Sequence, residues 1–414
     1  MSQPEHVLVV GAGLGGLRTV EQLRSAGFQG RISLVGDEPH APYDRPPLSK
    51  QVMTGEWAPE RTTLRSVEGL DDLGVRTHLG MRAVALRPGE VELADGASLH
   101  ADAIVVATGL AARTLPGQPA GVHTLRTLDH ALALRAALER ASSLLVIGGG
   151  FIGAEVASSA RTRGLAVTVL EALTVPSARA LGEELGALTG RLMTQAGVDL
   201  RTDVRIDGFV TGRADPADEG GGRIGVALAD GSRVTADVVV VGIGGVPRLG
   251  WMGGAPEAGA VPGGLPCGAT GRVEGLSGVW AVGDVAAWPD PTRGDRHRHE
   301  HWTSAGDQAA TVARDILGEP PPPARVPYFW SDQFGLKIQL FGRPEHADTL
   351  LPLHGDGLAG GAVRGTVMGL LADGRLAAVA GFGAARFVAR YRTLLQDGAD
   401  GAAALELAST LGAR

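Results

Sequence analysis

Two glycine-rich motifs of the same form stand at residues 11–16 (GAGLGG) and 148–153 (GGGFIG). Each follows a short apolar run and opens a stretch with helical periodicity. Their glycines permit a tight turn and a close approach of backbone to a pyrophosphate, and the free amides at the helix start bind the phosphates. An acid, Asp37 or Glu171, ends the next apolar run, 21 and 18 residues after the last glycine. The chain is therefore predicted to hold two dinucleotides.

The second acid also predicts which nucleotide binds at the second motif. A carboxylate at this place accepts hydrogen bonds from a ribose diol and repels a 2′-phosphate. Glu171 is followed by Ala172 and Leu173, with no arginine beside it. We therefore expect NADH rather than NADPH at this site.

The elements that must position the motifs alternate between strand and helix, which favours an α/β fold. Apolar runs at 103–107, 237–241 and 279–282 each end on a turn that contains glycine, as the strands before the two motifs do. A proline run closes this region, and a smaller α+β pattern follows it. We predict two nested Rossmann-like domains, of which the first binds FAD and the second NAD, with a C-terminal domain. Their ranges are 1–112 and 245–322 for the FAD domain, 113–244 for the NAD domain and 323–414 for the C-terminal domain.

Composition excludes several functional classes. The net charge of −7 over 414 residues argues against nucleic-acid binding. No apolar stretch reaches membrane-spanning length and the N-terminal residues lack the pattern of a signal peptide, so we expect a cytoplasmic protein. Cys267 is the only cysteine, which rules out an internal disulfide. Among 38 basic residues only Lys50 and Lys337 are lysine, so Lys50 is a candidate for specific chemistry.

Three further motifs, together with the two glycine-rich ones, point to a family. They are PYDRPPLSK at residues 42–50, VGD at 282–284 and FWSDQ at 329–333. In these motifs the chain resembles the NADH-dependent ferredoxin reductases of oxygenase systems, the family of putidaredoxin reductase and the dioxygenase reductases. These belong to the pyridine nucleotide-disulfide oxidoreductase superfamily of flavoproteins, whose fold is that of glutathione reductase.

The resemblance implies the site residues. FAD would be bound by the first motif and by residues spread along the chain: Gly11, Gly13, Leu14, Gly15, Gly16, Asp37, Arg45, Lys50, Ala83, Thr108, Gly109, Arg126, Asp284, Trp302 and Trp330. NADH would be bound by Gly148, Gly150, Phe151, Ile152, Gly153, Glu171, Gly242, Ile243 and Gly244. Lys50 and Glu155 would form a catalytic pair beside the flavin.

The resemblance also implies the reaction. Disulfide reductases of this superfamily carry a cysteine pair after the first βαβ unit, where this chain has Pro46, Pro47, Leu48 and Ser49. We therefore expect electrons to pass from NADH through FAD directly to a 2Fe–2S ferredoxin, which serves a cytochrome P450 or a Rieske-type ring-hydroxylating oxygenase. Two alternatives stay open: an NADH oxidase or nitrite-reductase-type flavoprotein, and a redox-sensing flavoprotein resembling apoptosis-inducing factor.

Two charged groups near the last motifs have competing interpretations. His297, His299 and His301 alternate in a way that can bind metal, but arginine and glutamate separate them and no fourth ligand is near, so we expect no metal site. Because the chain is net negative, docking of an acidic ferredoxin needs a local basic patch. The best candidates in the sequence are Arg293, Arg296, Arg298 and Arg314.

Overall fold

The computed structural model describes residues 3–212, 223–253, 263–290 and 294–412. The chain divides into two compact units, each built from separate stretches. The first contains Met1–Asp44, Glu60–Ala111 and Gly245–Arg325, and the second contains Arg45–Pro59, Ala112–Gly244 and Val326–Arg414. The division into FAD, NAD and C-terminal domains stays a prediction. The structure adds that the short stretch Arg45–Pro59, which contains the RPPLSK part of the PYDRPPLSK motif, groups with the second unit.

A parallel five-stranded sheet forms the centre of the first unit, in the order β19-β7-β1-β2-β3. Strand β1 lies in the middle of the sheet. The chain runs from β1 to β2 and β3 on one side and later crosses to β7 on the other, so the strand order reverses at β1. The first glycine motif follows β1 at this switch point. Ligands bind to open α/β sheets at such points. The strands are β1 (His6–Val10), β2 (Arg31–Gly36), β3 (Val75–Leu79), β7 (Ala103–Val106) and β19 (Val279–Ala281).

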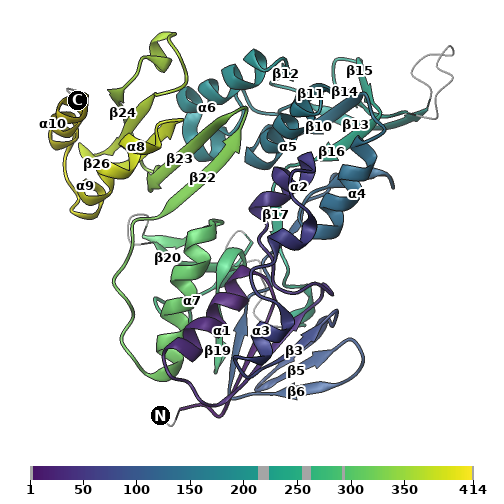
Figure 1. Cartoon of the computed structure of the whole chain (residues 1–414), viewed down its shortest axis with the longest axis vertical. Helices are drawn as coiled ribbons and strands as arrows, with labels where there is room; N and C mark the ends of the chain where they lie inside the picture. The colour runs from purple at the N-terminus through teal and green to yellow at the C-terminus, as the bar shows by residue number, and fades with distance from the viewer. Residues whose placement is uncertain (1–2, 213–222, 254–262, 291–293, 413–414) are drawn as a thin grey trace. The chain divides into compact units, whose positions relative to one another are not determined.

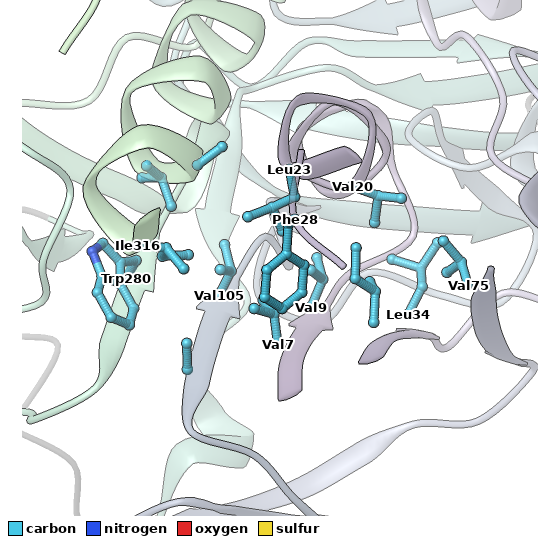
Figure 2. Packing of buried hydrophobic residues seen from close by; sticks show 14 of the residues in the cluster. Val7, Val9, Val20, Leu23, Phe28, Leu34, Val75, Val105, Trp280 and Ile316 are labelled. Atoms are coloured by element: carbon cyan, nitrogen blue, oxygen red, sulfur yellow. The ribbon is translucent and has the colours of Figure 1, made fainter. Parts of the chain in front are cut away.

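Helices cover one face of this sheet, and a second apolar cluster covers the other. Val7 and Val9 point to one side and Leu8 and Val10 to the other, so β1 is buried on both faces. On the first side, α1 (Leu14–Ser25) and α7 (Trp302–Leu317) lie next to each other (Figure 1). Figure 2 shows the core below them, where Phe28 lies among Val7, Val9 and Leu23.

The rest of the first unit is short strands and turns. A three-stranded antiparallel sheet is made of β4 (Ala83–Arg87), β5 (Glu90–Leu93) and β6 (Ser98–His100). The other elements are η2 (Pro59–Thr62), α3 (Val67–Asp71), β8 (Leu110–Ala112), β17 (Gly245–Pro247), η3 (Gly250–Met252), β18 (Leu265–Pro266), η4 (Gly283–Val285), β20 (Ala286–Asp290) and β21 (Asp295–His297).

The second unit repeats the same sheet, in the order β12-β11-β10-β16-β9, again with all strands parallel. The second glycine motif follows the central strand β10, as the first follows β1. The strands are β9 (Val122–Thr124), β10 (Ser143–Ile147), β11 (Ala166–Leu170), β12 (Asp199–Arg201) and β16 (Val238–Val241). The helices are η1 (Pro46–Ser49), α2 (Gln51–Thr54), α4 (Leu128–Leu138), α5 (Phe151–Thr162) and α6 (Ala178–Gln195), and β13 (Ile206–Gly212), β14 (Arg223–Leu228) and β15 (Arg233–Ala236) form an antiparallel sheet.

An antiparallel five-stranded sheet completes the second unit, in the order β22-β23-β26-β25-β24. Leucines of α6 pack on one of its faces, and Val388, Tyr391 and Ala404 from the C-terminal helices pack on the other. The strands are β22 (Tyr328–Gln333), β23 (Leu336–Gly342), β24 (Thr349–His354), β25 (Val367–Ala372) and β26 (Arg375–Phe382). Between and after them come η5 (Gly357–Ala359), α8 (Ala385–Val388), η6 (Ala389–Tyr391), α9 (Arg392–Gln396) and α10 (Gly401–Gly412).

The predicted fold class is confirmed: two Rossmann-like parallel sheets and a C-terminal α+β module. Within the described ranges, no helix has the length and apolar character needed to cross a bilayer.

A single carboxylate joins the starts of two central strands in the second unit. Asp237 precedes β16, and its Oδ2 accepts hydrogen bonds from the backbone amides and hydroxyls of Ser142 and Ser143 at distances of 2.7–2.9 Å. Burial by itself would raise the pKa of Asp237, but these donors outweigh it and lower the pKa from 3.8 to about 2. The ionised carboxylate therefore stabilises the register of β10 and β16.

We expect Asp237→Ala to reduce the free energy of unfolding by about 1 kcal/mol at pH 7, because solvent around this exposed residue screens part of the interaction. Since the pKa is lower in the folded chain than in the unfolded one, the stabilisation is complete well above pH 4 and is lost as the pH falls toward 2. Denaturant titrations of both proteins between pH 7 and pH 3 measure this. A difference that stays constant over that range would contradict the assigned role.

Candidate functional site

The first glycine motif has the backbone that a phosphate loop needs. A Cβ at Gly11, where φ is +116°, would overlap the carbonyl oxygen of Ala107, and one at Gly16 would overlap that of Gly11. These two glycines are thus required by backbone packing. Helix α1 begins directly after Gly13, and no side chain among the described residues caps its N-terminus. Its first amides are therefore available to an anionic ligand.

The second motif has the same geometry and shows the space for a ligand. A Cβ at Gly153 would overlap the carbonyl oxygen of Gly148, and one at Gly148 would meet that of Gly242. A Cβ at Gly150, by contrast, would have no heavy atom within 4 Å. Gly150 is the N-cap of α5, again without a side-chain cap in the described part of the chain. Open space in front of a helix start fits a pyrophosphate.

Glu171 lies against the second motif, as predicted. Its Oε2 accepts a hydrogen bond of 2.7 Å from the backbone amide of Gly149, and its Oε1 accepts one of 2.9 Å from that of Leu173. These bonds hold the carboxylate beside the loop, where a nucleotide ribose would lie. Gly242 packs behind the loop, donating its amide to Ile147, and the carbonyl of Gly244 accepts from Arg113.

The first acid has a partner that the sequence did not reveal. Oδ2 of Asp37 lies 2.5 Å from a guanidinium nitrogen of Arg248. The backbone of Arg248 is held by the predicted residues Thr108 and Gly109: its amide donates to the carbonyl of Gly109 and its carbonyl accepts from Thr108 Oγ1, each at 3.0 Å. No motif could have identified Arg248, because 211 residues separate it from Asp37.

Lys50 and Glu155 form the predicted pair inside the second unit. Nζ of Lys50 lies 2.6 Å from Oε2 of Glu155, and the side chains are 13% and 4% exposed. Two serines complete the group: Ser49 Oγ donates to Oε2 at 2.5 Å and Ser331 Oγ donates to Oε1 at 2.6 Å. Both serines were missed as site residues, although they stand inside the RPPLSK and FWSDQ motifs.

The other residues predicted for FAD divide between the two units. The first unit holds Ala83 at the start of β4, Asp284 in η4 and Trp302 at the start of α7, where Trp302 donates to Asp44 at 2.8 Å. The second unit holds Arg45 and Arg126, and Arg45 donates to the carbonyl of Arg126 at 2.5 Å.

Aromatic side chains of the second unit lie at the start of α5 and along β22. The ring of Phe151 packs on that of Phe329 with 4.4 Å between centroids, while Ile152 is 47% exposed. Trp330 faces the other way and stacks on Tyr328 with 5.6 Å between centroids. The binding roles of Phe151, Ile152, Ile243 and Trp330 stay predictions, as do those of all the other predicted site residues.

The histidines before α7 form a ladder of rings. Centroids of His297 and His299 are 5.1 Å apart, and those of His299 and His301 are 6.4 Å apart. Burial lowers the pKa of His301 to about 4, which keeps this ring neutral at pH 7. Within the ranges that the structure describes, no group of three His, Cys, Asp or Glu residues could hold a metal ion.

Two of the four arginines predicted to dock a partner form ion pairs within the first unit. Arg296 pairs with Glu274 and donates to the carbonyl of Cys267. Arg298 is 16% exposed and bonds Glu300 and the carbonyl of Asp284. These contacts offset much of their charge. Arg293 lies outside the described residues, and docking at this surface stays a prediction.

The only thiol of the chain, that of Cys267, lacks the properties of a redox group. Cys267 is fully buried in the apolar core beside β18, and its Sγ contacts the carbonyl of Leu265 at 3.3 Å. Burial raises the pKa of this thiol to about 12. Since the thiolate is the reactive form, Cys267 is inert at neutral pH.

Comparisons with known proteins agree with this geometry. The pyridine nucleotide-disulphide oxidoreductase family matches residues 5–309, and the reductase C-terminal family matches residues 328–409. The chain is 38% identical to rhodocoxin reductase of Rhodococcus erythropolis over 83% of its length and 79% of that protein. It is 37% identical to the ferredoxin reductase component of chlorobenzene dioxygenase from Cupriavidus sp. (strain PS12), covering 94% of this chain and 92% of that one.

A solved structure extends the likeness to the whole chain. The crystal structure of the covalent putidaredoxin reductase–putidaredoxin complex matches with a TM-score of 0.88 and 28% identity, covering 99% of both chains. The match includes both Rossmann-like sheets and the C-terminal module. The chain therefore belongs to the pyridine nucleotide-disulphide oxidoreductases and, within them, to the ferredoxin reductase family.

Proposed function

We propose that the protein passes electrons from NADH through FAD to a 2Fe–2S ferredoxin that serves an oxygenase, either a ring-hydroxylating dioxygenase or a cytochrome P450. The observation that carries this proposal is the absence of a thiol relay. The motif after the first βαβ unit contains Ser49 and Lys50 instead of cysteines, and the single cysteine of the chain is inert. Electrons must therefore leave for an external acceptor directly.

When bound, FAD would supply the link between NADH, a two-electron donor, and a ferredoxin, a one-electron acceptor. The residues of this chain bind and orient. We propose that the glycine motifs hold the two pyrophosphates, that Asp37 and Glu171 bind the riboses, and that Lys50 stabilises the negative charge of the reduced flavin. Glu155 holds the ammonium group of Lys50 in place. NADH is made inside cells, and we therefore propose a cytoplasmic location.

The decisive experiment measures where the electrons go. The purified protein should carry one FAD per chain, and NADH should reduce cytochrome c rapidly only when a 2Fe–2S ferredoxin is present. Cys267→Ala should retain this turnover within about twofold, because the thiol lies in the core. Rapid oxygen consumption without ferredoxin would instead favour an NADH oxidase. Slow reoxidation by every ferredoxin tested would favour the redox-sensing alternative.

Glu171 provides a test of nucleotide choice. A negative carboxylate beside the ribose repels a 2′-phosphate, so kcat/KM should be higher for NADH than for NADPH. The ratio of the two values should correspond to a free-energy difference of about 1 to 3 kcal/mol. Glu171→Gln keeps an acceptor for the amide of Gly149 and removes the charge, so the preference should shrink. Stopped-flow flavin reduction with both nucleotides measures the ratio. An unchanged ratio in the variant would show that Glu171 does not recognise the ribose.

Substitutions at two glycines of the second motif test NADH binding and folding separately. Gly150→Ala places its methyl group in open space, so the protein should fold normally and bind NADH on the order of tenfold more weakly, about 1.4 kcal/mol. Gly153→Ala forces a Cβ into the carbonyl oxygen of Gly148 and should lower the melting temperature. Calorimetry and NADH titration distinguish them. Equal NADH affinity of Gly150→Ala and the parent would place the pyrophosphate elsewhere.

A further inference from the structure

One face of β22 packs against α5 through residues spaced to match both elements. Phe329 and Ser331 are alternate residues of the strand and therefore share a face. On the helix, Phe151 and Glu155 are four residues apart and also share a face. Phe151 contacts Phe329, and Glu155 accepts from Ser331. Strand β22 thus contacts α5 through an aromatic pair and a buried hydrogen bond.

The neighbours of Ser331 determine which acceptor receives the hydrogen bond from its hydroxyl group. Ser331 is fully buried, and its Oγ also lies 3.2 Å from the amide nitrogen Nε2 of Gln333. That nitrogen can only donate, so it takes a lone pair of Oγ. An ionised carboxylate can only accept, so the single proton of Ser331 is donated to Oε1 of Glu155. Strand pairing of Ser331 with Ile338 fixes the backbone behind this donor.

The carboxylate of Glu155 needs a hydrogen bond such as that from Ser331 to keep a single orientation. The last torsion of a glutamate side chain is broad, so a carboxylate held at one oxygen can still rotate. In this structure Ser331 holds Oε1, while Ser49 and Lys50 bind Oε2. The carbonyl of Ser49 accepts a further bond of 2.6 Å from Ser159 of α5, which holds the backbone of this loop on the same helix.

We propose that Ser331 is a positioning residue, through which the C-terminal module orients Glu155 and so holds Lys50 for electron transfer. Its effect on the reaction rests on the proposed function, because Lys50 matters only if it serves the flavin. Ser331 touches neither nucleotide motif. It acts on the reaction through Glu155, and the strand β22 that carries it belongs to the last module of the chain.

The chain offers a matched control on the same helix. Ser158 Oγ accepts a hydrogen bond of 2.8 Å from the backbone amide of Phe334, which directly follows β22. This bond also joins α5 to the C-terminal module, but it does not involve Glu155. Ser158→Ala therefore weakens the packing of the module without releasing the carboxylate, whereas Ser331→Ala does both.

The experiment compares the FAD-loaded parent, Ser331→Ala and Ser158→Ala by stopped-flow reduction with NADH. In Ser331→Ala the limiting rate of flavin reduction should fall on the order of tenfold, while the NADH concentration at half-saturation stays the same. Ser158→Ala should match the parent in both. In a Glu155→Gln background, Ser331→Ala should add little, because residues that act through one another are not additive.

Hydrogen exchange provides a readout that does not depend on turnover. Amides of residues 48–54 should exchange several-fold faster in Ser331→Ala than in the parent and in Ser158→Ala, because the freed carboxylate holds Ser49 and Lys50 less firmly. If Ser331→Ala is recovered poorly, Ser331→Cys, close in volume but a weak donor, should show the same changes. Parent-like rate and exchange in these variants, or equal losses in Ser158→Ala, would overturn the proposal. A parent that NADH does not reduce would refute the proposed function, and the exchange data would still test Ser331.

Discussion

The second unit depends on the ion pair and hydrogen bonds that the buried carboxylate of Glu155 makes with its neighbours. An ionised group taken out of water is costly unless it is paired and hydrogen-bonded. Glu155 is 4% exposed and satisfies this requirement with three donors from two other segments: Ser49 and Lys50 from the RPPLSK loop, and Ser331 from β22. One charge on α5 therefore links the nucleotide-binding fold, the loop and the C-terminal module.

Backbone sterics impose the second constraint, and they do so twice. In both units the strand before the glycine motif lies in the middle of a parallel sheet, and the loop turns back so tightly that a side chain at the first or last glycine would overlap a carbonyl oxygen. The same packing leaves Gly150 facing open space. The first and last glycines of each motif are thus required by the fold, whereas Gly150 leaves open space in front of the helix.

The two Rossmann-like sheets, the α+β module and the family could all be predicted from the amino-acid sequence. Local patterns carry this information: an apolar strand, a glycine turn, a helix and an acid lie within about 30 residues of each other, the size of one βαβ unit. The lysine of the Lys50–Glu155 ion pair was identifiable for a similar reason, since RPPLSK is a contiguous motif. The pairing of Lys50 with Glu155, by contrast, was predicted only through the resemblance to the family and not from the spacing of the two residues.

Contacts between residues far apart in the chain were decided by the tertiary structure alone. Arg248 meets Asp37 across 211 residues, and Ser331 meets Glu155 across 176. Two of the four arginines that looked like a basic patch in the sequence are paired with acids, Arg296 with Glu274 and Arg298 with Glu300. Sequence patterns report which face of an element is buried. The direction of one hydrogen bond, or the charge left on a surface, depends on which elements the fold brings together.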